Sequence, residues 1–252
     1  MRRAVTIAVL FLCLAAGGIA VFRWKEQRDA RIQKDEYTQM RQGQTLGQIT
    51  AQETDLFQAI PVDFQSLQKE NPDIYAWITI PGTEIDDPVL QSGEADDTYL
   101  THDASGAEND AGAIYSEQEN QKDFSDMLTV LYGRSSVAGG RFADLFQYED
   151  QTFLEEHPLI TVYTPDKVIW YQIFAAYRYD DRHLLKSFDC SDQAVYNAYI
   201  KGILEQRNLY ACIDSQASPQ WPQKILTLST GHPSGDDYRY LVQAAEVRKQ
   251  MF

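Results

Sequence analysis

A series of short β-type segments runs from about residue 61 to the end of the chain, and it narrows the possible folds more than any other feature. The segments are IYAWITI, PVLQ, GAIYS, LTVLYG, LITVYT, VIWYQIFAAYRY, KILTLST and YRYLVQAAEV. Each is rich in β-branched and aromatic residues, and Gly, Pro, Asp and Asn lie between them. The pattern predicts one mostly β domain over residues 61–252, a barrel or a sandwich, with no internal repeat.

Two helices are expected within this domain. The segment DFQSLQKEN at its start predicts a short helix. Between two late strands lies SDQAVYNAYIKGILEQR, in which Ser191 is the expected N-cap. Val195, Tyr199 and Ile203 follow four residues apart and would form one apolar stripe. We therefore expect this helix to lie across the β structure.

The first 60 residues have a different composition. Residues 4–22 carry no charged side chain. As a helix, a segment of this length would nearly span a hydrocarbon core of about 30 Å. A cleaved signal peptide is the alternative, but its apolar region is usually shorter, about 7 to 15 residues. We predict a membrane anchor over residues 1–24 and a polar helical stalk over residues 25–60. Lys and Arg flank the apolar run on both sides, so they leave its orientation open.

Charge and cysteine usage exclude several classes of protein. A net charge of −15 argues against a nucleic-acid partner, because neutralising phosphates requires clustered Lys and Arg. The three cysteines have neither zinc-site spacing nor the density of a disulfide scaffold. Cys190 and Cys212 could be bridged in an exported protein, although two separate buried thiols are the preferred interpretation. No metal and no cofactor are predicted.

Several segments of the domain resemble class B sortases in order and spacing. They are NPDIYAWITIPGTEIDDPVLQ, YLTHD, GAIYS, LYG, the run from GGRFADLFQYED to VIWYQIFAAY, and LTLST with an arginine beyond it. That family consists of membrane-anchored cysteine transpeptidases of Gram-positive bacteria. The resemblance implies a closed β-barrel of about eight strands with a helix between its sixth and seventh strands. It also implies that the C-terminal domain lies outside the cell.

The resemblance assigns three catalytic positions, and this chain retains one of them. The family has a nucleophilic cysteine directly after LTLST, a histidine directly after LYG and an arginine that stabilises the oxyanion. Here the first two positions hold Gly231 and Arg134, and the third holds Arg239. Glycine has no nucleophile, and an arginine with a pKa above about 12 cannot exchange a proton near neutral pH. We therefore expect a sortase-like protein that is not a transpeptidase.

Other residues near these positions are weak replacements. Ser229 shares the strand face of Gly231, but it lacks a base, and we expect its hydroxyl to be hydrogen-bonded inside the barrel. Strand alternation would turn His232 to the opposite face, and we expect a surface histidine there. Three further histidines are not assigned catalytic roles: His102, and His157 and His183 in turns exposed to solvent.

Arg134 and Arg239 are expected at neighbouring strand ends, both facing the family's catalytic cleft. Two fixed cations repel, so a counter-charge is required. Asp236 or Asp237 is the preferred one. The alternative is a bound anion, either a peptide carboxylate or an acidic cell-wall group, and the expected ligand-binding residues are Arg134, Arg239, Ser229 and His232.

Three functions follow from this sequence. The first is a non-catalytic module on a cell membrane, which binds a sorting-signal-like peptide or a cell-wall component and assists surface protein anchoring or pilus assembly beside an active sortase or a pilin. The second is an active acyl transferase with a relocated nucleophile. The third is an envelope spacer without a ligand.

Overall fold

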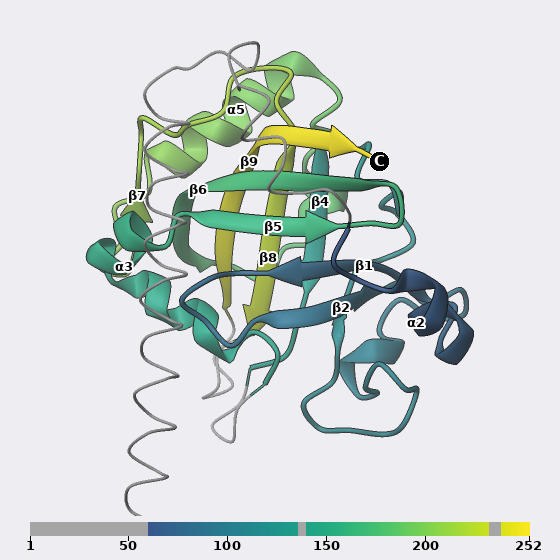
Figure 1. Cartoon of the computed structure of the whole chain (residues 1–252). Coiled ribbons are helices and arrows are strands. Elements are labelled where there is room, and N and C mark those ends of the chain that lie inside the picture. The colour runs from purple at the N-terminus through teal and green to yellow at the C-terminus, as the bar shows by residue number, and fades with distance from the viewer. Residues whose placement is uncertain (1–59, 136–139, 232–237) are drawn as a thin grey trace, which may run out of the picture.

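The computed structural model of the chain describes residues 60–135, 140–231 and 238–252, and β-strands dominate them (Figure 1). The strands are β1 (Ile74–Thr79), β2 (Asp86–Leu90), β3 (Ile114–Tyr115), β4 (Leu128–Tyr132), β5 (Leu159–Tyr163), β6 (Lys167–Tyr179), β7 (Cys212–Ile213), β8 (Ile225–Gly231) and β9 (Arg239–Met251). The helices are α2 (Phe64–Glu70), η2 (Thr98–Leu100), η3 (Ala143–Glu149), α3 (Gln151–Glu156), α4 (Leu184–Ser187) and α5 (Gln193–Leu204), of which η2 and η3 are 3₁₀-helices.

Eight of the strands close into a barrel. They pair in the order β5-β1-β2-β3-β4-β8-β9-β6, and a further pairing of β5 with β6 completes the ring, while β7 pairs with β6 outside it. The pairs β2–β3 and β4–β8 are parallel, and the other pairs are antiparallel. Each of the eight β-type segments of the sequence overlaps one strand of the ring. The predicted closed barrel of about eight strands is confirmed.

The barrel is filled by one face of every strand. Successive side chains of a strand point to opposite faces, so alternate residues turn inward. Ile78 on β1, Leu131 on β4, Leu228 on β8 and Val242 on β9 are fully buried in this inner cluster. Burying each such side chain stabilises the fold by roughly 1.5–3 kcal/mol. The β-branched and aromatic composition that predicts the strands therefore also supplies the core.

A second apolar cluster lies on the outer face of β4, β6, β8 and β9, where α5 packs. Tyr199 of α5 reaches the sheet directly, because its hydroxyl accepts a hydrogen bond from Gln243 Nε2 of β9 at 2.7 Å. Gln243 also accepts one from Thr227 of β8 at 2.8 Å. This buried polar chain places α5 against the outer face of the barrel, as the sequence predicts for the insertion.

Two details of the α5 prediction are wrong. The N-cap is Asp192, whose carboxylate accepts from the backbone N–H groups of the second and third helical residues, so Ser191 lies outside the helix. The buried stripe consists of Tyr196, Tyr199, Ile200 and Ile203, and Val195 is half-buried. Spacings of three and four residues follow the 3.6-residue period more closely than spacings of four throughout.

The start of the described chain agrees with the sequence prediction of a short helix. Asp63 caps α2 by accepting from the backbone N–H of Ser66 at 3.1 Å, and Phe64 is its buried residue. The predicted anchor over residues 1–24 lies outside the described residues, as does nearly all of the predicted stalk. Within the part of the chain that the structure describes, no helix combines the length and apolar character needed to cross a membrane.

Candidate functional site

Three strand ends meet at one edge of the barrel. Since β8 runs parallel to β4 and antiparallel to β9, the end of β4, the end of β8 and the start of β9 are neighbours. The register pairs Tyr132 with Ser229 and Gly231 with Arg239. The backbone N–H of Gly133 also donates to the Ser229 carbonyl at 3.2 Å, which continues the β4–β8 pairing beyond β4. The strand ends that carry Arg134 and Arg239 therefore lie on the two sides of the end of β8, rather than directly beside each other as the sequence predicts.

These residues belong to the outer face of the barrel. Val130 and Tyr132 of β4 and Leu241 of β9 are part of the outer cluster, and the residues that alternate with them fill the interior. By the same two-residue period, Arg134, Gly231 and Arg239 continue the outer face. We call the five residues Tyr132, Arg134, Ser229, Gly231 and Arg239 the strand-end site.

Neither the packing nor the backbone conformation requires a glycine at position 231. Gly231 is exposed, and a Cβ added to it would have no atom of the described ranges within 4 Å. Its φ does not lie in the left-handed region that favours glycine. Its carbonyl accepts a hydrogen bond from the Ser135 hydroxyl, which ties the end of β8 to the residue after Arg134. The missing side chain therefore leaves open space at the centre of the strand-end site.

Arg239 lies over an aromatic platform. Its Cζ is 5.9 Å from the centroid of the Tyr132 ring, which stacks at 5.6 Å on Tyr115. This is within the range of a cation–π contact. Burial, with the nearby Glu117 carboxylate, raises the pKa of Tyr115 to about 12, and burial likewise raises the pKa of Tyr132. Both phenols therefore stay neutral, and the platform adds no negative charge.

The arginines of the strand-end site have no carboxylate partner among the described residues. Both are half-buried, and no Asp or Glu in the described ranges lies within ion-pair distance of Arg134 or Arg239. The Arg134 carbonyl accepts from the backbone N–H of Phe142 at 3.1 Å, which holds its main chain. Asp236 and Asp237, the preferred counter-charges, lie outside the described residues, so their pairing stays a prediction.

Ser229 differs from its prediction. It is 1% exposed, but its hydroxyl has no hydrogen-bond partner in the described part of the chain. Ser229 also faces the outer cluster rather than the barrel interior. Successive residues of a strand point to opposite faces, and the preceding residue, Leu228, points into the interior. The expected hydrogen bond inside the barrel is wrong. His232 lies outside the described residues.

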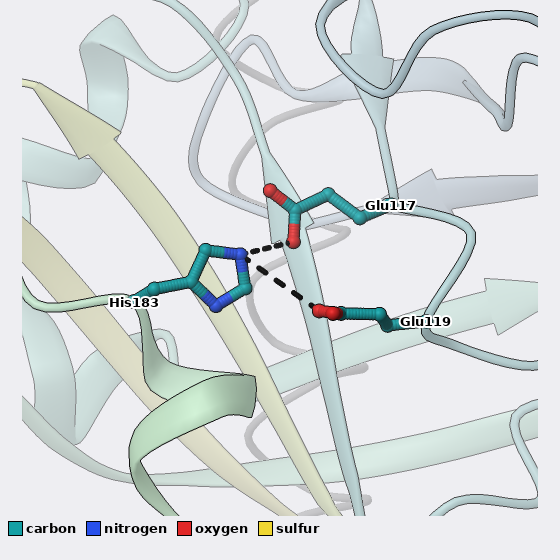
Figure 2. A group of neighbouring side chains, drawn as sticks. All are labelled: Glu117, Glu119 and His183. Carbon is teal, nitrogen blue, oxygen red and sulfur yellow. Dashed lines mark ion pairs between the residues drawn. The ribbon is translucent and has the colours of Figure 1, made fainter.

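A charged group beside the strand-end site was not found by sequence reasoning. It consists of Glu117 and Glu119, which lie in the loop between β3 and β4, and of His183, which directly precedes α4 (Figure 2). His183 Nε2 lies 2.6 Å from Glu117 Oε2, and the Tyr132 hydroxyl donates to the same oxygen at 3.3 Å. The prediction that His183 is solvated is wrong, because Glu117 engages it and its side chain is 29% exposed.

The geometry of this group is that of a short hydrogen bond between an imidazole and a carboxylate. His183 Nδ1 accepts a long bond of 3.4 Å from the backbone N–H of Lys186, which favours a proton on Nε2, directed at Glu117. The Nε2–Oε2 distance of 2.6 Å is also shorter than the roughly 3.4 Å between two ligands of a tetrahedral zinc ion with bonds of about 2.1 Å. Glu119 lies farther away, at 3.9 Å from Nε2. A metal ion would have to displace the proton and separate the pair.

The two described cysteines are poor nucleophiles. Cys190 and Cys212 are free and buried, which confirms two separate thiols. Burial, assisted by Asp189, raises the pKa of Cys190 to about 12, and burial also raises the pKa of Cys212. Thiolate formation is therefore disfavoured at both. His157, expected in solvent, instead packs against Phe153 with a ring separation of 4.5 Å.

Comparisons with known proteins agree on one family, although no family model matches the chain. Sortase B of Listeria monocytogenes is 28% identical over 230 residues, which is 91% of this chain and 89% of that protein. Its solved structure has a TM-score of 0.61 and 31% identity and covers 72% of this chain and 98% of that chain. A complex of Staphylococcus aureus sortase B with substrate has a TM-score of 0.66 at 24% identity, over 88% and 98% of the respective chains.

Proposed function

Because the chain belongs to the class B sortase family, we propose that it is a non-catalytic member of that family that binds peptides at the strand-end site. In this role it would act as a binding or accessory module in surface protein anchoring or pilus assembly. Its partners would be a sorting-signal-like peptide or a cell-wall component, and an active sortase or a pilin.

The proposal depends on the two residues at the positions that the sequence resemblance assigns to the family's reactive groups. Gly231 occupies the end of β8 with no side chain, and Arg134 follows the end of the adjacent β4. A transpeptidase needs a nucleophile and a group that gives and recovers a proton at these places. Members of a catalytic unit act together, so the loss of both leaves little rate to recover.

The alternative of a relocated nucleophile has no support among the described residues. Cys190 and Cys212 are buried, and their raised pKa values keep them protonated. Ser229 is buried as well, and no described base contacts its hydroxyl. Activation of a serine requires a base within hydrogen-bond reach.

Peptide binding itself is supported by the barrel and by the surroundings of the site. The related Staphylococcus aureus enzyme was solved with substrate. In this chain, Arg239 keeps the family's anion-stabilising position and lies over Tyr132. We further propose that the protein is held at the cell membrane by a single N-terminal span, with its C-terminal domain outside the cell.

A sorting-peptide assay on the full-length chain tests the proposal. We expect peptides of the NPxTN or LPxTG type to bind without cleavage, and no acyl adduct to be found by intact-protein mass spectrometry. The double variant Gly231→Cys and Arg134→His is the matched comparison, because it restores both residue types at the family positions. Cleavage or a covalent adduct with the unaltered chain would refute the non-catalytic function, and absence of binding would refute the peptide-binding function.

A further inference from the structure

The space at Gly231 lies between two cationic residues. Gly231 pairs directly with Arg239 across β8 and β9. On the other side, Tyr132 pairs with Ser229, and extending this parallel register by two residues sets Arg134 opposite Gly231. The hydrogen bond from the Ser135 hydroxyl to the Gly231 carbonyl keeps this part of the chain beside the end of β8. A group that entered the space would have an arginine residue on each side.

The space beside Gly231 exists because glycine has no side chain. A Cβ at Gly231 would meet no atom of the described residues within 4 Å, so these residues leave the strand end open beyond the size of one methyl group. In a chain with a cysteine at this position, the thiol would occupy that room. Here a planar three-atom group such as a carboxylate can take its place.

The charges around the space favour an anion. Arg134 and Arg239 have no ion pair with any carboxylate in the described ranges. Glu117 lies beside Tyr132, but His183 and the Tyr132 hydroxyl already engage its carboxylate. Arginine matches the planar geometry of a carboxylate with two parallel N–H donors.

From these observations we propose that the strand-end site binds the free α-carboxylate of a peptide, with the carboxylate in the space left at Gly231 and held by Arg134 and Arg239. The inference rests on the proposed function and specifies its ligand. An active transpeptidase accepts an internal amide at this position, whereas this site would select a peptide that already ends there. Two sources share this chemistry: the cleaved end of a sorting signal, and a cell-wall peptide that ends in D-alanine.

The experiment compares peptides that differ only in the terminal group. The fluorescein-labelled tetrapeptide Asn-Pro-Ala-Thr is prepared as the free acid and as the carboxamide, and a labelled D-alanyl-D-alanine peptide is prepared in the same two forms. Fluorescence anisotropy with the full-length chain measures each dissociation constant. We expect at least one acid to bind about tenfold or more tightly than its amide, because charge-assisted contacts to carboxylate are stronger than neutral ones. The free-acid peptide that binds more tightly identifies which of the two sources the site prefers.

Three variants locate the effect. Arg239→Gln and Gly231→Val should each remove most of the preference for the acid, the first by removing a cation and the second by filling the space. Arg248→Gln is the matched control, since Arg248 is a half-buried arginine of the same strand that stacks on Trp170 at 4.8 Å. It should leave the preference unchanged.

The outcomes separate this inference from the proposed function. Equal binding of acid and amide overturns the carboxylate inference but leaves peptide binding intact. Failure of all four peptides to bind overturns both. A preference for the acid that survives Arg239→Gln and Gly231→Val together would place the carboxylate elsewhere, and it would also overturn the inference.

Discussion

Replacing Gly231 with alanine should stabilise the protein. A glycine within a strand is destabilising by roughly 0.5–1 kcal/mol relative to alanine, because it loses more backbone freedom on folding. In the described part of the chain nothing at Gly231 opposes this gain, because φ is outside the left-handed region and the added Cβ would meet no atom within 4 Å. We therefore expect the free energy of unfolding to rise by about 0.5–1 kcal/mol, which corresponds to about 1–4 °C in Tm for a chain of this size.

Gly133→Ala is the matched control on the neighbouring strand end. A Cβ at Gly133 would lie 2.6 Å from Cγ and Cδ2 of Phe142, whose side chain is fully buried and cannot move aside freely. Overpacking of this kind costs roughly 1–3 kcal/mol. Differential scanning calorimetry of the two variants should give shifts in Tm of opposite sign. A loss of stability in Gly231→Ala would refute the reasoning, because it would mean that the strand end requires a glycine.

Two other predictions concern charge. Stability should fall as pH rises from about 9 to about 12, because burial raises the pKa of Cys190 and of Tyr115 to about 12 from 9.0 and 10.0. In this range these two side chains ionise more readily in the unfolded chain than in the folded one. The stabilisation is complete below the pKa values of the unfolded state and is lost as the pH approaches the pKa values of the folded state. Urea midpoints that stay constant between pH 8.5 and 11 would contradict this. His183→Ala should lower the free energy of unfolding, measured by urea denaturation, by roughly 1 kcal/mol, because the variant loses the contact with Glu117. Lys186→Ala is the control. It removes an exposed contact of 3.8 Å with Glu119 and should change the free energy of unfolding by less than about 0.5 kcal/mol. Equal effects of these two variants would show that the His183 pair adds nothing.

The barrel could be predicted from the sequence because its signals are local. The alternating β-branched and aromatic segments and the turn residues between them identify all eight strands of the ring. The helix of the insertion was also predicted, but its cap was not, since two adjacent residues, Ser191 and Asp192, can both serve as N-caps. The backbone geometry at the first turn decides between them.

The candidate site could be predicted only in part. Motif spacing singled out Arg134, Gly231 and Arg239, and the barrel places the strand ends of the two arginines on either side of the end of β8. The pair of His183 with Glu117 could not be predicted, because a contact between two distant loops leaves no pattern in either segment. The sequence also did not show that the Ser229 hydroxyl has no hydrogen-bond partner among the described residues, because strand alternation says which side a residue faces, but not which atoms cover it.

The sequence by itself determined the number and character of the strands, and its motif spacing predicts glycine and arginine at the positions that the family resemblance assigns to reactive residues. These properties depend on side-chain identity and on spacing along the chain. The tertiary structure decided that the space at Gly231 is open, that Arg239 lies over Tyr132, and that Glu117 is held by His183 rather than by an arginine. Such properties depend on distances between residues far apart in the chain, and these distances exist only when the barrel has closed.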